Sequence, residues 1–224
     1  MIIVVANEKG GTGKTTLATN LAVYRAINAS DVLLVDADPQ NSCRDFVAVR
    51  DEEAHQPTVT CASITGKSLA GELRKMEHKF DDIVVDVGGR DSTSMRSALL
   101  AADVVLIPFS PSQLDAWSLE KMDQLIHDVK QLNENLIALS VINRADTNPK
   151  IILSNEASDF ADELENIEFL NLRVGDRVAY RRAVAEGLAV TELPSSKRDA
   201  KAISEIKNLY NEVFNYEEKA KAIA

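Results

Sequence analysis

The residues best suited to chemistry lie near the start of the chain, in a glycine-rich loop between an apolar run and a helical pattern. The loop consists of Lys9, Gly10, Gly11, Thr12, Gly13, Lys14, Thr15 and Thr16. Residues 2–6 before it are apolar and β-rich, and residues 17–22 after it have helical spacing. Glycines let backbone N–H groups turn inward, and a helix N-terminus carries partial positive charge. This strand–loop–helix arrangement predicts a polyphosphate-binding site.

Two side chains of the loop have defined roles in such a site. Lys14 supplies a positive charge for the outer phosphates, and the Thr15 hydroxyl is a suitable ligand for Mg²⁺. The usual phosphate-loop pattern places a glycine five positions before Gly13, where this chain has Glu8. The chain instead carries an additional lysine, Lys9, ahead of its glycine pair. A glycine turn with incidental lysines is the alternative interpretation, and it leaves the flanking strand and helix unexplained.

Three aspartates end or follow predicted strands. Asp36 and Asp38 follow the apolar run 32–35, and Asp86 follows the run 83–85. The carboxyl ends of parallel strands lie at one edge of a sheet, where open α/β sheets bind ligands. Carboxylates beside bound phosphates require a cation between them, so we expect Mg²⁺ there, held by Asp86 directly or through water. For the first two aspartates, a solvated turn after the strand is the alternative.

Apolar runs and helical patterns alternate along the rest of the chain. Further strands are expected at residues 58–62, 103–108, 136–142 and 167–172, and helices at 41–49, 69–80, 113–132, 149–164, 180–187 and 196–214. The pattern predicts an α/β fold, a single-domain P-loop NTPase with a doubly wound, mostly parallel sheet and helices on both faces. We place the domain at residues 1–216 and expect the charged, alanine-rich residues 217–224 to fray.

Composition limits the classes of function. The chain has 224 residues and a formal net charge of −10, which argues against a protein that coats nucleic acid with its whole surface. Cys43 and Cys61 form no C-x-x-C pair and the three histidines stand apart, so we expect neither a disulfide scaffold nor a structural zinc site. No apolar run approaches membrane-spanning length, and the first residues do not resemble a signal peptide. We expect a cytoplasmic protein.

The loop resembles the deviant Walker A motif of the ParA/MinD family, K-G-G-x-G-K-T-T. The D-x-D-P-Q segment at residues 36–40 and the Walker B aspartate, Asp86, also match that family. The segment P-S-x-x-D at residues 111–115 is similar to the partition ATPases in particular, where this region lies near the dimer interface. The resemblance covers nearly the whole chain and is nearest to the short ParA-type, ParF-like plasmid partition proteins.

The resemblance implies ATP and Mg²⁺ as cofactors and slow ATP hydrolysis. In the family, the first lysine of the motif, here Lys9, reaches across a nucleotide-sandwich dimer to the phosphates of the partner. Lys14 completes the phosphate site, and Asp38 orients the attacking water. The resemblance further implies that Asp36 supports the water shell of the magnesium ion bound by Thr15.

Three details beside the motifs stay open. The family places a small residue and a proline after the Walker B aspartate, whereas this chain has Val-Gly-Gly-Arg at residues 87–90; Arg90 either responds to the γ-phosphate or is a solvated loop residue. Asn143 and Arg144 end a strand at the edge where the nucleotide base binds, and the Asn143 amide suits adenine, although capping a loop is nearly as good an explanation. For Trp117, we favour ordinary helix packing over an interface role.

A basic segment lies near the C-terminus of the acidic chain. Residues 173–207 contain eight lysines and arginines against five acids, a net charge of +3 that leaves −13 for the remainder. By resemblance to ParA-type proteins we expect sequence-independent DNA binding by an ATP-bound homodimer, through phosphate contacts. The candidate DNA contacts are Arg177, Arg181, Arg182, Lys197, Arg198 and Lys201. A solvated surface is the alternative.

The function expected from these observations is a nucleoid-associated ATPase that segregates a plasmid, with hydrolysis stimulated by a cargo-bound, ParB-like adaptor protein. A positioning ATPase for a protein microcompartment is the main alternative. A MinD-like membrane switch is disfavoured because the last predicted helix keeps its apolar stripe for the core. A reductase is disfavoured because no cysteine follows Asp86 closely, and an amide ligase stays open.

Overall fold

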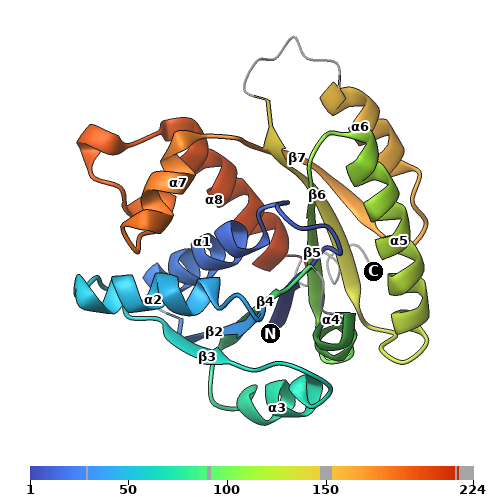
Figure 1. Ribbon diagram of the computed structural model, residues 1–224, viewed down its shortest axis with the longest axis horizontal. Coiled ribbons are helices and arrows are strands. Elements are labelled where there is room, and N and C mark those ends of the chain that lie inside the picture. The colour runs from blue at the N-terminus through green and yellow to red at the C-terminus, as the bar shows by residue number, and fades with distance from the viewer. Residues whose placement is uncertain (29, 90–91, 147–152, 215, 217–224) are drawn as a thin grey trace.

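The fold is built on a parallel sheet of seven strands, in the order β3-β2-β4-β1-β5-β6-β7 (Figure 1). The computed structural model describes residues 1–28, 30–89, 92–146, 153–214 and 216. The strands are β1 (Ile2–Val5), β2 (Val32–Ala37), β3 (Thr60–Ser63), β4 (Asp82–Val87), β5 (Val104–Phe109), β6 (Ile137–Ala145) and β7 (Glu168–Gly175). All pairings among these strands are parallel. The sheet confirms the expected doubly wound P-loop architecture.

Helices cover both faces of the sheet (Figure 1). One layer contains α1 (Lys14–Ile27), α2 (Ser42–Glu52), α7 (Val178–Ala185) and α8 (Ala200–Phe214), and the other contains α3 (Leu69–Met76), α4 (Ser92–Leu99), α5 (Gln113–Lys130) and α6 (Leu153–Asp162). Alternate residues of the central strands enter the two cores: Ile3 and Val5 face the first layer, and Ile2 and Val4 face the second. Burial on both sides explains why these strands are continuous apolar runs.

Most predicted elements exist, with shifted ends. The helix expected at 69–80 ends at Met76, and α2 runs three residues further than expected. The helix expected from residue 196 begins at Ala200, because the Asp199 carboxylate accepts the N–H groups of Lys201 and Ala202 and caps the helix there. A short 3₁₀ turn, η2 (Ser195–Lys197), precedes it, and another, η1 (Val190–Glu192), follows α7. The expected start of α6, Arg90 and residues 217–224 lie outside the described residues.

The sheet brings the predicted site residues to one edge. The loop after β1 and the turns after β2 and β4 all leave from the carboxyl ends of adjacent parallel strands. In the β2–β4 register Asp36 lies directly opposite Asp86, although fifty residues separate them in the sequence. The topology therefore assembles phosphate-loop and carboxylate residues that the sequence alone could only place at the same edge.

Candidate nucleotide and magnesium site

The phosphate loop adopts a backbone that its glycines permit. Gly11 and Gly13 have φ angles of 80° and 90°, in the region that side chains rarely adopt. A Cβ atom on Gly13 would lie 2.2 Å from Asn143 Nδ2, so any side chain there would collide with the neighbouring strand end. Asn143 Nδ2 donates to the Thr12 carbonyl oxygen at 2.7 Å and fixes the loop against β6. The predicted base-recognition residue therefore also positions the phosphate loop.

Helix α1 presents an uncapped N-terminus to the loop. No side chain caps the helix at Gly13, and its first turn contains no acidic residue. The first N–H groups and the helix dipole are thus directed toward a site that suits an anion. Thr12 Oγ1 is buried and has no hydrogen-bond partner in the described part of the chain. A pocket of about 340 Å³ opens in front of the loop, lined by Gly10, Gly11, Gly13, Lys14, Thr15 and Thr16 and by residues of β6, β7 and α7.

Lys14 lies at the base of this pocket. Its ammonium donates to the Lys9 carbonyl oxygen at 2.9 Å, and its side chain is largely buried. Burial lowers the pKa of Lys14, while the Asp86 and Asp38 carboxylates act in the opposite direction. A bound polyphosphate would offer this ammonium charged oxygen partners in place of a single carbonyl.

Thr15 and Asp86 form the metal-binding half of the site. The Thr15 hydroxyl donates to Asp86 Oδ2 at 2.6 Å, and the Cys43 thiol donates to the same oxygen at 3.4 Å. Burial raises the pKa of Asp86 to about 7, against the opposing effect of the Thr15 hydrogen bond. A hydroxyl and a buried carboxylate in contact fit a magnesium ion, which takes few protein ligands and completes its shell with water and phosphate oxygens. The contact of Cys43 with Asp86 was not predicted, and the position of Cys43 in the sequence does not indicate it.

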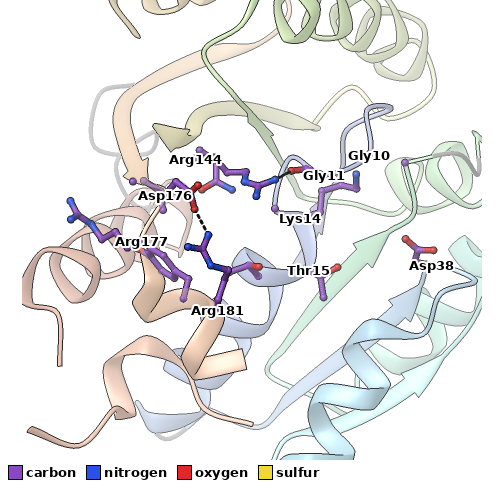
Figure 2. A pocket seen from close by; sticks show the side chains of 16 residues that line it. Gly10, Gly11, Lys14, Thr15, Asp38, Arg144, Asp176, Arg177 and Arg181 are labelled. Carbon is purple, nitrogen blue, oxygen red and sulfur yellow. Dashed lines mark hydrogen bonds and ion pairs between the residues drawn. The ribbon is translucent and has the colours of Figure 1, made fainter. Parts of the chain in front are cut away.

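Asp36 and Asp38 differ in their surroundings. Both Asp36 oxygens accept backbone N–H groups, from Asp38 at 3.1 Å and from Arg44 at 3.0 Å, so this fully buried carboxylate also shapes the turn after β2. Asp38 is half-buried and lines the phosphate pocket, with Oδ1 accepting the Gln40 N–H at 3.0 Å. Of the two, Asp38 is the one that lines the pocket in front of the phosphate loop, where Figure 2 shows its side chain.

Two glycines replace the proline that the family pattern places after the Walker B aspartate, and both pack tightly. A Cβ on Gly88 would lie 3.0–3.1 Å from the Asp38 carboxylate, and one on Gly89 would lie 3.0–3.1 Å from Glu8 O, Lys14 Nζ and Lys9 C. The absence of side chains therefore lets this turn approach both the phosphate loop and Asp38. The departure from the family pattern is compatible with a complete site.

Lys9 is paired within its own chain. Its ammonium lies 2.6 Å from Oδ2 of Asp115, a buried residue in the first turn of α5 that also accepts the Ser112 hydroxyl. Sequence reasoning noted the P-S-x-x-D segment but not this partnership. Trp117, two residues further, has 54% of its surface exposed, so the expectation of ordinary helix packing is wrong.

The far end of the pocket is formed by residues of β6, β7 and α7. Arg144, with a φ angle of 55°, donates from Nη1 to the Gly11 carbonyl oxygen at 2.6 Å (Figure 2). The same pocket is also lined by Val174, Gly175, Asp176, Arg177, Tyr180 and Arg181. Sequence reasoning assigned Arg177 and Arg181 to DNA and did not identify the rest, because nothing in their spacing indicates that the turn after β7 meets the phosphate loop.

The six predicted DNA contacts cluster around α7 and the start of α8, but they differ in their partners. Arg177 lies 2.6 Å from Glu205, Arg181 lies 2.8 Å from Asp176 and Lys197 lies 2.7 Å from Glu186. Arg182, Arg198 and Lys201 are exposed and have no ion pair within the described residues. Three of the six predicted DNA contacts are therefore without an ion pair in the described part of the chain.

Comparison with known proteins agrees with this geometry. Residues 3–190 match the family described as the CobQ/CobB/MinD/ParA nucleotide binding domain. The chain belongs to this family. Maintenance of carboxysome distribution protein A of Halothiobacillus neapolitanus is 32% identical to it over 214 residues, 95% of each chain. Protein ParA of Rhizobium radiobacter is 28% identical over 180 residues, 80% of each chain.

Solved structures share the fold. A plasmid partition protein of Borrelia burgdorferi bound to AMPPNP superposes with a TM-score of 0.71 at 21% identity, over 96% of this chain and 98% of that one. A cobyrinic acid a,c-diamide synthase of Mycobacterium smegmatis, with an ATP analogue and magnesium, gives 0.75 at 18% identity, over 96% and 94%. One of these two solved structures thus holds an ATP analogue with magnesium on the same fold. In the described part of the chain, no helix is both long and apolar enough to span a bilayer.

Proposed function

We propose that this protein is an ATPase that positions a cargo, switching between an ATP-bound dimer and a monomer. The observation that carries the proposal is that Lys14, Thr15 and Asp38 line one pocket in front of an uncapped helix N-terminus, with the buried Asp86 hydrogen-bonded to Thr15. In this assignment ATP lies with its phosphates in the loop formed by residues 9–16. The base lies at the other end, beside Asn143 and Arg144.

Each residue of the site has a separate role in hydrolysis. Thr15 and Asp86 would hold Mg²⁺, with Asp36 supporting its water shell, and the bound ion would supply positive charge beside the phosphates. Lys14 contacts the outer phosphates, and Asp38 orients the water that attacks the γ-phosphorus. Since Asp38 is half-buried and its carboxylate lies against Gly88, its position is set by the turn after β4.

Dimerisation supplies the remaining cation. Lys9 pairs with Asp115 in the isolated chain, and in the proposed dimer it leaves that carboxylate for the phosphates bound to the partner subunit. Phosphate oxygens carry more negative charge than one carboxylate, so bound ATP favours the exchange. ATP thereby stabilises the dimer, and hydrolysis weakens it.

The proposed cargo is a protein microcompartment. Sequence reasoning favoured a plasmid, but the relative that is 32% identical over 95% of both chains is a carboxysome distribution protein, and the ParA protein is less similar over a shorter stretch. The ATP-bound dimer would hold DNA without sequence preference through the α7–α8 surface. An adaptor on the cargo would stimulate ATP hydrolysis, which would release the dimer from DNA.

A plasmid is the second candidate cargo, supported by the likeness to ParA. Co-purification from cells separates the two: a tagged protein with the hydrolysis-deficient Asp38→Ala substitution should retain its adaptor. An adaptor that binds shell or interior proteins of a microcompartment supports the first proposal. An adaptor that binds repeated DNA sites supports the second and overturns the first.

A further inference from the structure

Two cavities of the described structure share one wall, the turn between β7 and α7. Asp176 and Arg177 line the nucleotide pocket and also line a more open groove of about 670 Å³ on the other side. The groove also includes the cations predicted to meet DNA: Arg182, Lys197, Arg198 and Lys201. We call residues 176–177, between β7 and α7, the shared turn, because they line both the proposed ATP site and the proposed DNA site.

One carboxylate of α8 holds the shared turn. Glu205 Oε1 lies 2.6 Å from Arg177 Nη2 and 2.9 Å from Arg177 Nε. Glu205 Oε2 accepts the Gly175 N–H at 3.2 Å and the Tyr180 hydroxyl at 3.1 Å. The side chains of Arg177 and Glu205 are each only 16% exposed. The donors come from the last residue of β7, the turn itself and the first turn of α7, so a single side chain fixes where α7 begins.

The surroundings of Arg177 do not suit a DNA contact. Its guanidinium faces Glu205 and also lies 3.9 Å from an oxygen of Asp199, so two carboxylates already neutralise it. A partly buried, bidentate pair is costly to break, because the partner charge is left without compensation. By contrast Arg182 is exposed on the same helix and has no ion pair within the described residues. Figure 2 shows Arg177 directed away from Lys14 and the phosphate loop, so we do not expect it to contact the phosphates of a bound nucleotide.

We propose that Arg177 is a positioning residue that, through Glu205, holds the shared turn in the geometry required by bound ATP. The backbone of Gly175 and Asp176 forms part of the pocket wall, so displacing the turn removes contacts at the base end of the nucleotide. Lysine cannot replace arginine in this role, since it lacks the planar fork that reaches a carboxylate through two N–H groups. This inference rests on the proposed function, because the positions of ATP and DNA are taken from it.

The test uses two measurements on the full chain with three single variants. Binding of a fluorescent ATP analogue with Mg²⁺ is titrated without DNA, and binding of random-sequence duplex DNA is titrated at several salt concentrations with saturating nucleotide. Arg177→Gln should raise the nucleotide Kd on the order of tenfold, as expected for loss of a charge-assisted bidentate pair, and Arg177→Lys nearly as much. Lys207→Gln, which removes an exposed cation from α8 outside both cavities, should leave nucleotide affinity unchanged.

The salt dependence of DNA binding provides the contrast. Each lost phosphate contact lowers the slope of log K against log salt by about 1. Arg182→Gln should show that decrease, whereas Arg177→Gln should keep the slope of the original protein. Unchanged nucleotide affinity in Arg177→Gln overturns the proposal, and a slope reduced as in Arg182→Gln assigns Arg177 to DNA instead.

Failure of the proposed function can be told apart from failure of this inference. If the original protein binds nucleotide but no DNA, the DNA-binding proposal fails, while the nucleotide titration of Arg177→Gln still decides the positioning role. Thermal unfolding checks that each variant is folded. Glu205→Gln, which keeps the side-chain volume, gives an independent variant, and the double variant should be no worse than either single one. Additive losses in the double variant contradict the shared role of the pair.

Discussion

Lys14 of the phosphate loop and the cations of the α7–α8 surface have different kinds of partner. Lys14 donates to a backbone carbonyl within a pocket, and the nearby carboxylates, Asp86 and Asp38, belong to the proposed metal and hydrolysis site. On the α7–α8 surface, Arg177, Arg181 and Lys197 are each paired with a carboxylate of the same surface. The difference shows that a contiguous motif fixes where a charge lies, whereas an excess of charge in a segment does not show which charges are available to a ligand.

The largest effect is expected at Asp38, inside the motif-defined region. Asp38→Ala should lower the rate of ATP hydrolysis by about 10²–10⁴-fold, the usual contribution of a residue that positions or deprotonates the attacking group. Nucleotide binding should persist, because the phosphate loop and Lys14 are unchanged. Steady-state hydrolysis and analogue titration measure the two quantities. Normal turnover in this variant would remove Asp38 from the mechanism.

Lys14→Ala is expected to weaken ATP binding by on the order of a hundredfold, through loss of a charge-assisted contact to the outer phosphates. Lys75→Ala is a suitable control, since Lys75 is 72% exposed and pairs only with Glu72 within the described residues. Calorimetric titration with an ATP analogue and Mg²⁺ compares the two. Equal affinities for both variants would contradict the assignment of the phosphate site.

The unpaired cations of the α7–α8 surface should carry most of its DNA affinity. Replacing Arg182, Arg198 and Lys201 together with glutamine should lower DNA affinity at least about tenfold and reduce the salt slope by about 3 per subunit. Anisotropy titrations on random-sequence DNA across a salt series measure both effects. An unchanged binding isotherm would show that these residues are only a solvated surface, and DNA binding would then be removed from the proposed cycle.

The smallest effect is expected where a surface cation is already paired. Asp176→Asn releases Arg181 from an ion pair whose side chains are 61% and 47% exposed. Exposed pairs contribute about 0.2–1 kcal/mol, so DNA affinity should rise by no more than about fivefold. The same anisotropy assay detects this gain. A loss of DNA affinity would show that Asp176 contributes to DNA binding by this surface and does not weaken it by pairing with Arg181.

The sequence was sufficient for the fold and for placing the phosphate loop at the edge of the sheet. Continuous apolar strands alternating with helices specify a parallel sheet, and parallel strands must end at the same edge, where the structure brings Thr15 and Asp86 into contact. Helix ends were less predictable, since the capping of α8 by Asp199 depends on where the preceding turn directs the chain.

Pairings across long separations could not be predicted. Arg177 and Glu205 are 28 residues apart, and Lys9 and Asp115 are 106 apart, so their contact depends on how α8 and α5 pack on the sheet. Trp117 shows a different limit: this aromatic side chain was expected to pack, but helical spacing from the buried Leu119 and Met122 places it on the opposite, exposed face of α5.

Molar mass in solution tests the central claim most directly. Light scattering coupled to size exclusion, with Mg²⁺ and a slowly hydrolysed ATP analogue, should give twice the mass of the chain, and the mass of one chain with ADP or without nucleotide. Lys9→Ala should bind the analogue and remain a monomer. If the original protein stays a monomer when saturated with the analogue, the proposed dimer, its DNA binding and its positioning role are all contradicted.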